Sequence, residues 1–181
     1  MYMIGVDPGA HGAAVLIRCE RMGSVVTASV FDGIVTKSQI DYNLLRDRLN
    51  DLLAYPGAGD ESHVCMERID PVWIPGKGGG PSSGNASATL VSGLLGGAVR
   101  FWAATHKLPI TIVPAKVWQA VLGTKAPTRP ERKRAELRVA RELFPACELR
   151  AGAGRLVPHD GIVAALLIAE YGRRQLIGNS T

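Results

Sequence analysis

Cysteine is scarce in this chain of 181 residues, and its three cysteines lie far apart, at Cys19, Cys65 and Cys147. No two of them form a CxxC pair, and their number is odd. The sequence therefore supports neither a disulfide framework nor a zinc ribbon. We expect the protein to work in a reducing compartment.

Long hydrophobic runs and targeting segments are also missing. The most apolar stretch, residues 86–99, is shorter than the ~20 residues that a membrane-spanning helix needs. The first residues contain neither the basic region nor the apolar region of a signal peptide. No repeat or linker divides the sequence, so we expect one domain over residues 1–181, in the cytoplasm and away from membranes.

Acidic residues are outnumbered, and the imbalance is local. The chain contains 21 Lys and Arg against 16 Asp and Glu, a net charge of +5. Residues 125–155 contain nine basic and four acidic residues, so this segment alone accounts for the net charge. Concentrated positive charge is typical of a surface that meets a polyanion such as nucleic acid. Solubility alone is the alternative explanation.

The hydrophobic pattern predicts an α/β fold. Three strand-like runs, at about 2–7, 12–18 and 24–31, are separated by short turns that favour an antiparallel meander. Two later strands, at 63–69 and 110–113, have helix-compatible neighbours, which favours parallel pairing. Residues 70–85, rich in Gly and Pro, are predicted to form a loop. Helices are predicted at 39–55, 86–105, 114–122, within the basic segment, and at 160–176.

Small residues dominate the predicted helix at 86–105. Gly93, Gly96 and Gly97 lower its helix propensity but allow another backbone to come close. The pattern indicates either tight packing within the chain or a dimer face.

Acidic residues interrupt two strands that are otherwise apolar. Asp7 ends the first strand, and Glu67 follows the apolar residues 64–66. A buried carboxylate is costly unless it is paired with a cation. Asp160 begins the last predicted helix. Together the three offer the oxygen ligands that hard divalent cations prefer, and two such ions about 3.5–4 Å apart can cleave a phosphodiester.

Each of these carboxylates also has a structural explanation when it is considered alone. Asp7 precedes Pro-Gly and is a good turn former, Glu67 could pair with a base such as Arg68, and Asp160 could cap a helix. Their joint placement favours the metal site.

Three segments in this order, MIGVDPGAHGAAV, VCMERI and PHDGIVAALLIAEYG, resemble the RuvC-type Holliday-junction resolvases, especially their short phage and prophage members. PAKVWQAVLGTK and the basic stretch ending in ELFP are also similar to that group, so the resemblance covers residues 2–172. It implies a ribonuclease H-like fold, with a mixed five-stranded sheet of three antiparallel and then two parallel strands, flanked by helices.

The resemblance also implies an activity. It implies a homodimer in the bacterial or phage-infected bacterial cytosol that resolves four-way DNA junctions by paired, symmetric, metal-dependent nicks. For this chain it implies two Mg²⁺ ions per active site, replaceable by Mn²⁺, with Asp7, Glu67 and Asp160 as their ligands.

The last helix departs from the family pattern at Ala164, where a second acidic residue is expected one turn after Asp160. A carboxylate there would lie on the same helix face. We therefore count residue 164 among the catalytic positions; the chain is either an inactivated variant or a natural sequence in which His159 and Asp160 suffice. His159 is a candidate to donate to the scissile phosphate or assist the leaving group, with a structural role as the alternative. A functional role is less expected for His11.

Basic and aromatic side chains near these segments are candidates for DNA binding, because phosphates must be neutralised before carboxylates approach them. Trp73, in the loop after Glu67, could stack on an unpaired base or pack against the core. Trp102 and Trp118 have apolar helical neighbours and are predicted to be buried. The predicted DNA contacts are Trp73, Lys77, Lys116, Lys125, Arg129, Arg132 and Lys133, with Arg155 as an addition.

Other functions share parts of this pattern. Actin-like and sugar-kinase ATPases also begin with a strand, an acid and a Gly turn, but they need two such domains, and this chain is too short. A ribonuclease H-like nuclease that acts on RNA or on other branched DNA is one alternative. A junction-binding protein without catalysis is another, for which Ala164 is the only evidence.

Overall fold

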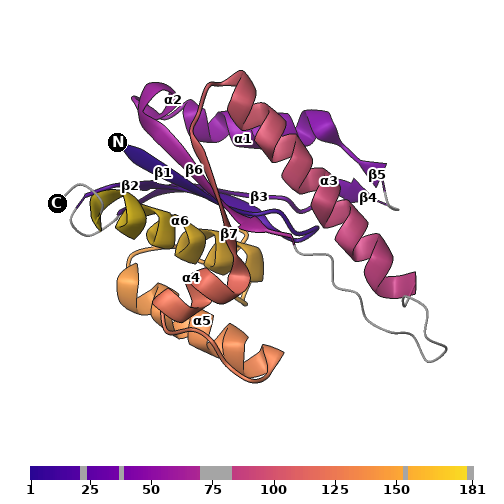
Figure 1. Ribbon diagram of the computed structural model, residues 1–181, viewed down its shortest axis with the longest axis vertical. Coiled ribbons are helices and arrows are strands. Elements are labelled where there is room, and N and C mark those ends of the chain that lie inside the picture. Colours follow the sequence, from indigo (N-terminus) through magenta and orange to yellow (C-terminus); the bar gives the residue numbers. More distant parts are fainter. Residues whose placement is uncertain (21–23, 37–38, 70–82, 153–154, 179–181) are drawn as a thin grey trace.

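The computed structural model describes residues 1–20, 24–36, 39–69, 83–152 and 155–178. A five-stranded mixed sheet lies at its centre (Figure 1), with the strand order β3-β2-β1-β6-β7. β1 pairs antiparallel with β2 and parallel with β6, β2 pairs antiparallel with β3, and β6 pairs parallel with β7. The strands are β1 (Tyr2–Asp7), β2 (Ala13–Arg18), β3 (Ser24–Val30), β6 (Ser62–Arg68) and β7 (Ile110–Pro114).

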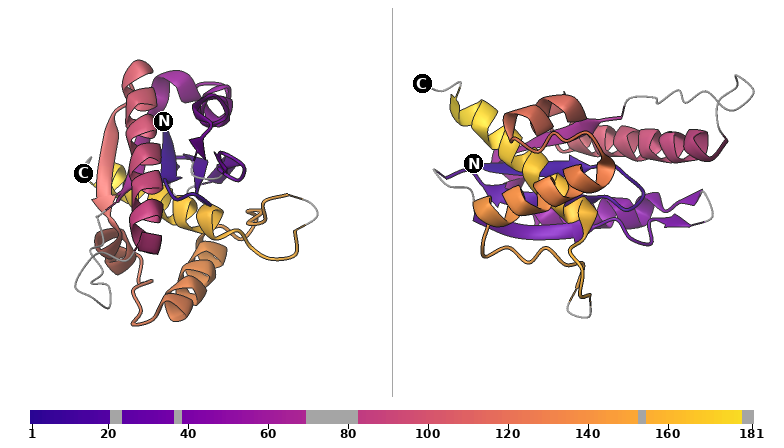
Figure 2. Two further views of the ribbon diagram at one scale, coloured as in Figure 1. Left: turned by 90° about the vertical axis from the view of Figure 1, so that its right-hand side faces the viewer. Right: turned by 90° about the horizontal axis from the view of Figure 1, so that it is seen from below.

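Helices cover both faces of the sheet (Figure 2). One face carries α1 (Tyr42–Leu53) and α3 (Ser83–Thr105), with the four-residue α2 (Ala58–Glu61) beside them. The other face carries α4 (Ala115–Val121), α5 (Arg129–Leu143) and α6 (Asp160–Gly178).

Each face of the sheet has its own apolar core, and β1 contributes to both. Ile4 and Val6 pack with residues of α1 and α3, whereas Met3 packs with residues of α4, α5 and α6. Side chains alternate between the faces of a strand, so a central strand with two covered faces is apolar throughout. Asp7, the last residue of β1, is the first charged residue of this strand.

The predicted mixed sheet with flanking helices is confirmed, but several boundaries were wrong. A separate hairpin of β4 (Val35–Thr36) and β5 (Gln39–Ile40) precedes α1, so the two parallel strands are the sixth and seventh in the chain. The helix predicted from residue 39 begins at Tyr42, because the Asp41 side chain accepts a hydrogen bond from the N–H of Leu44 at 2.9 Å and caps it. The helix predicted from residue 86 begins at Ser83, and Pro114 ends β7 and caps α4 rather than opening that helix.

Helix α6 crosses the sheet in direct backbone contact with β1. A Cβ atom added at Gly5 would overlap the carbonyl oxygen of Ala165 and lie 2.5 Å from the backbone nitrogen of Ala169. This close approach sets the position of α6, and therefore of Asp160 at its start, relative to Asp7.

We expect Gly5→Ala to destabilise the fold by about 3 kcal/mol, because the added methyl group forces α6 away from β1. The free energy of unfolding, measured in urea, tests this expectation. Gly59→Ala is the matched control, since its Cβ would approach only the Leu53 carbonyl oxygen, at 4.0 Å. Equal stability of the two variants would contradict the close packing.

Within the described ranges, no helix combines the length and apolarity that crossing a bilayer requires.

Candidate active site

Asp7 and Glu67 lie side by side at the carboxyl ends of two central strands, β1 and β6. β1 and β6 are parallel neighbours, and Val6 lies opposite Met66. The next residues, Asp7 and Glu67, are therefore also neighbours, at the same end of the two strands. The Asp7 carboxylate accepts a hydrogen bond from the N–H of Gly9 at 3.1 Å, so this residue also forms the turn after the strand. The indole N–H of Trp118 donates to Oε2 of Glu67 at 2.8 Å.

The environment of these two carboxyl groups disfavours their charged forms. Desolvation raises the pKa of Asp7. Desolvation, followed by repulsion from Asp7, raises the pKa of Glu67 to about 7. Glu136 adds repulsion to both groups, and Lys133 opposes it. Such a pair of carboxylates favours the binding of a proton or a cation between them.

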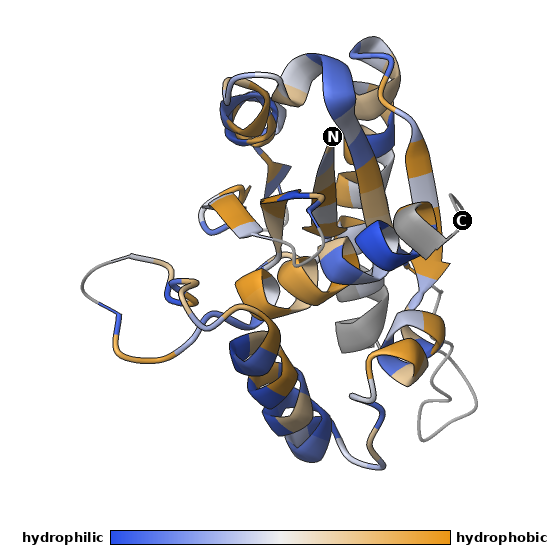
Figure 3. Cartoon of the chain, turned by 90° about the vertical axis from the view of Figure 1, so that its left-hand side faces the viewer, coloured by the Kyte–Doolittle hydropathy of each residue, from blue (hydrophilic) through white to orange (hydrophobic). Residues whose placement is uncertain are grey.

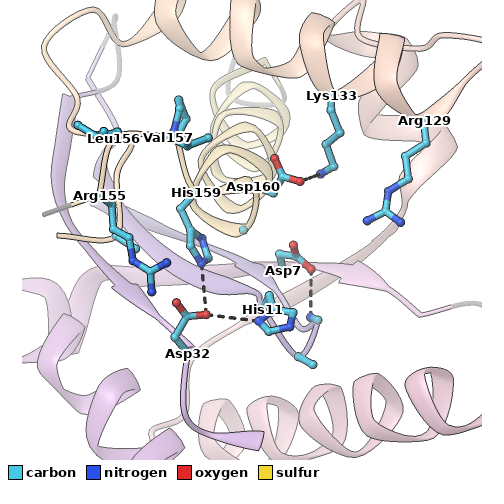
Figure 4. Close-up of a pocket in the computed structure, with 15 residues that line it drawn as sticks. Asp7, His11, Asp32, Arg129, Lys133, Arg155, Leu156, Val157, His159 and Asp160 are labelled. Carbon is cyan, nitrogen blue, oxygen red and sulfur yellow. Dashed lines mark hydrogen bonds and ion pairs between the residues drawn. The ribbon is translucent and has the colours of Figure 1, made fainter.

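A cavity of about 670 Å³ opens beside Asp7 (Figure 4). Asp160, the first residue of α6, lines the same cavity, and its side chain is 67% exposed. Lys133 reaches in from α5, with its Nζ 4.0 Å from Oδ2 of Asp160. Arg129 and Arg155 also line the cavity, so basic side chains flank the carboxylates.

His159 holds the start of α6 through both ring nitrogens. Its Nδ1 accepts a hydrogen bond from the N–H of Ile162 at 3.3 Å, and its Nε2 lies 3.4 Å from Oδ1 of Asp32 (Figure 4). With Nδ1 as the acceptor, a neutral ring carries its proton on Nε2 and donates it to Asp32. His159, rather than Asp160, therefore caps the helix.

Asp32 joins His159 to the turn between β1 and β2. Its Oδ1 is also 3.5 Å from Nδ1 of His11. Desolvation raises the pKa of Asp32, but hydrogen bonds and charge interactions with the two histidines lower it overall. Gly161 lies against the same turn, since a Cβ there would overlap the backbone carbonyl of His11. These contacts fix α6 beside the Asp7 end of β1.

Ala164 lies one helical turn after Asp160 and is 5% exposed. It is therefore positioned on the Asp160 side of α6, as predicted, and has no side-chain oxygen of its own.

The predicted DNA contacts differ in their positions. Arg129 and Lys133 line the cavity, as does Arg155. Arg132 turns toward Glu136, with its Nε 3.7 Å from Oε1. Lys116 and Lys125 are exposed and do not line the cavity. Trp73 and Lys77 lie outside the described residues.

The predicted metal ligands are only partly assembled. Among the described residues, no three His, Cys, Asp or Glu side chains form a group that could hold a metal ion. Asp7 and Glu67 nevertheless fit a hard divalent cation, because they are adjacent oxygen donors whose burial disfavours charge without a cation and raises their pKa values. Asp160 lines the same cavity as Asp7, whereas Glu67 is not among the residues that line it.

No protein-family model matches this sequence, and no curated protein matches it. Solved structures do match the fold. A structure of T. thermophilus RuvC in complex with a Holliday junction substrate is similar with a TM-score of 0.61 and 15% identity, over 98% of this chain and 97% of that chain. A further structure of Thermus thermophilus RuvC gives a TM-score of 0.60 and 16% identity over the same shares. The chain has the RuvC fold.

The RuvC fold agrees with the mixed sheet of this chain. Several side chains at the site were missed in the sequence. Glu136 carried a usable signal, because it shares the buried side of α5 with Val139 and Ala140, where an apolar residue is expected. Trp118 was predicted to be buried and is 1% exposed, but its bond to Glu67 was not foreseen. Asp32, which follows the third strand, carried no signal.

Proposed function

We propose that this protein is a structure-selective endonuclease that resolves four-way DNA junctions by paired, symmetric, metal-dependent cleavage of phosphodiesters. One observation carries the proposal: Asp7 lies beside Glu67 at the ends of two parallel strands, and Asp7 lines a cavity flanked by basic side chains. The fold supports it, because T. thermophilus RuvC, which shares that fold, is found with a Holliday junction substrate.

In this proposal, Asp7, Glu67 and Asp160 hold two Mg²⁺ ions, which Mn²⁺ can replace. The bound ions supply an activated water and stabilise the leaving oxygen. Trp118 fixes the orientation of Glu67 through its hydrogen bond at 2.8 Å. His159 positions the start of α6, and with it Asp160, through its contacts with Ile162 and Asp32.

The DNA backbone would be held by the basic side chains around the cavity. Arg129, Lys133 and Arg155 line it, and Lys125 lies on the loop that leads into α5. Their charges lower the cost of bringing a phosphate to the carboxylates. Arg132, Lys116, Lys77 and Trp73 remain candidates for contacts further along the junction arms or with an unpaired base.

Binding selectivity tests the substrate class. At moderate salt and in EDTA, we expect a four-way junction to bind about 100-fold more tightly than a linear duplex of the same sequence. Gel-shift titration measures both dissociation constants. Equal affinity for the two DNAs would contradict junction recognition, and tighter binding of an RNA–DNA hybrid would favour the ribonuclease alternative.

We further propose that two copies of the chain pair through α3. Leu94 and Phe101 on its outer side are 45% and 77% exposed, and with Tyr42 of α1 they line an apolar groove of about 670 Å³. Within the described part of the chain, a Cβ at Gly93 or Gly97 would meet no atom within 4 Å, which leaves room for a partner helix. Symmetric nicks require two active sites, and a second copy supplies the other one.

We expect Phe101→Glu to convert a dimer into a monomer, because it places a charge in the apolar groove. Sedimentation velocity at micromolar concentration measures the change. Val121→Glu is the control, since Val121 is also 49% exposed but lies on α4, away from the groove. A Phe101→Glu protein that stays dimeric would contradict pairing through this face.

A further inference from the structure

Helix α5 is strongly hydrophilic (Figure 3), yet one of its acidic side chains is buried. Glu136 is 1% exposed and lies on the same side of the helix as Val139 and Ala140. Burying a carboxylate costs free energy unless cations or hydrogen bonds compensate it. Its contacts therefore show what keeps it in place.

Three polar side chains surround the Glu136 carboxylate. Nε2 of Gln119 donates a hydrogen bond to Oε1 at 3.2 Å, and Nε of Arg132 lies 3.7 Å from the same oxygen. Nζ of Lys133 lies 3.2 Å from Oε2. Oε2 has no hydrogen-bond partner within the part of the chain that the structure describes. Lys133 is therefore the cation that compensates the negative charge at Oε2.

Lys133 connects Glu136 to the catalytic cavity. Its ammonium lies 3.2 Å from Glu136 and 4.0 Å from Asp160, and its side chain lines the cavity. Its charge also acts on Asp7 and Glu67. A free lysine side chain samples many rotamers, so a buried carboxylate that holds the ammonium there removes an entropy cost from any step that needs it.

Helix α4 supports this arrangement with two consecutive residues. Trp118 donates to Glu67 at 2.8 Å, and Gln119 donates to Glu136 at 3.2 Å. One short helix therefore orients a proposed metal ligand and the carboxylate that holds Lys133.

We propose that Glu136 is a positioning residue that holds the Lys133 ammonium inside the cavity, where it meets the phosphate to be cleaved, and that Glu136 assists cleavage through Lys133. The role of the phosphate rests on the proposed function. The contact between Glu136 and Lys133 does not depend on it.

Glu136→Gln tests the kinetic part, in whichever of the parent chain and Ala164→Asp cleaves junctions. The amide keeps the shape of the side chain and an oxygen to accept from Gln119, but it loses the charge that holds Lys133. We expect kcat to fall about 10- to 100-fold while KM stays within about twofold. Glu142→Gln is the matched control, because Glu142 pairs with Arg138 at 2.8 Å on the exposed side of the same helix.

A double-mutant cycle separates positioning from an independent role. If Glu136 acts through Lys133, Glu136→Gln combined with Lys133→Ala loses no more activity than Lys133→Ala alone. Losses that multiply would overturn the proposal, because Glu136 would then act on the metal or the DNA directly.

Chemical labelling of Lys133 tests the contact without any cleavage. Acetylation by an amine-reactive ester, followed by peptide mass spectrometry, compares Lys133 with the exposed Lys116. We expect labelling of Lys133 to be about fivefold faster in Glu136→Gln and unchanged in Glu142→Gln, because only the first frees the ammonium. An unchanged rate would overturn the proposal. Faster labelling in a protein that cleaves no junction would contradict the proposed function and leave the contact established.

Discussion

Junction cleavage is expected to rise on the order of a hundredfold or more when Ala164 is replaced by Asp. Residue 164 lies one turn after Asp160 on the same side of α6, and the sequence resemblance to RuvC-type resolvases predicts an acid there. The added carboxylate supplies an oxygen ligand to a cavity in which the described residues form no complete metal group. Single-turnover cleavage of a labelled four-way junction in Mg²⁺, and again in Mn²⁺, measures the gain.

Ala164→Asn is the control for this prediction, because it has the same shape as Asp and no charge. We expect no gain from Asn. Ala164→Asp should also destabilise the protein in EDTA, since position 164 is 5% exposed, and Mg²⁺ should reverse that loss. If the parent chain cleaves as fast as Ala164→Asp, then His159 and Asp160 suffice and no carboxylate is needed at 164.

Glu67→Gln is expected to stabilise the metal-free protein by up to about 3 kcal/mol at pH 8. Desolvation and repulsion from Asp7 raise the pKa of Glu67 from 4.5 to about 7 in the folded state. The folded state therefore binds a proton more tightly than the unfolded state. The cost of the charged carboxylate is full above pH 7, shrinks as the pH falls from 7 to 4.5, and is absent below 4.5, where both states are protonated.

Urea unfolding in EDTA at pH 8 and at pH 4.5 measures this effect, with Glu142→Gln as a surface control. Mg²⁺ should then invert the order at pH 8, because the parent chain gains stability from the cation and Glu67→Gln loses a ligand. A Glu67→Gln protein that is less stable than the parent in EDTA at pH 8 would contradict the claim that the charged, buried Glu67 carboxylate beside Asp7 destabilises the fold. Equal stabilisation of both proteins by Mg²⁺ would contradict the metal site.

The sequence was most informative where local pattern decides structure. The apolar runs predicted the central strands, and the acids that interrupt two of them singled out Asp7 and Glu67. The parallel pairing of β1 with β6, which brings these two residues together, is seen only in the structure. The hairpin of β4 and β5 was missed because strands of two residues have no periodicity to detect. Ile40 fitted the helical spacing of α1, although the cap at Asp41 excludes it.

The contacts around the carboxylates could not be predicted, because they depend on how the helices pack. Lys133 and Glu136 are three residues apart on a helix. The position of Lys133 at the cavity requires α5 to lie against α6, and the hydrogen bond of Glu136 with Gln119 requires α5 to lie against α4. The roles of the two nitrogens of His159 depend on Asp32, which is distant in the sequence. No pattern within one helix or strand contains that information.

The most direct test of the proposed function is cleavage of a labelled immobile four-way junction, compared with a linear duplex and an RNA–DNA hybrid in Mg²⁺ or Mn²⁺. The parent chain and Ala164→Asp are assayed together. We expect Ala164→Asp to place paired nicks symmetrically across the junction and to leave the duplex and the hybrid intact. Cleavage of the hybrid alone would assign the protein to RNA, and junction binding without cleavage by either protein would contradict an enzymatic role.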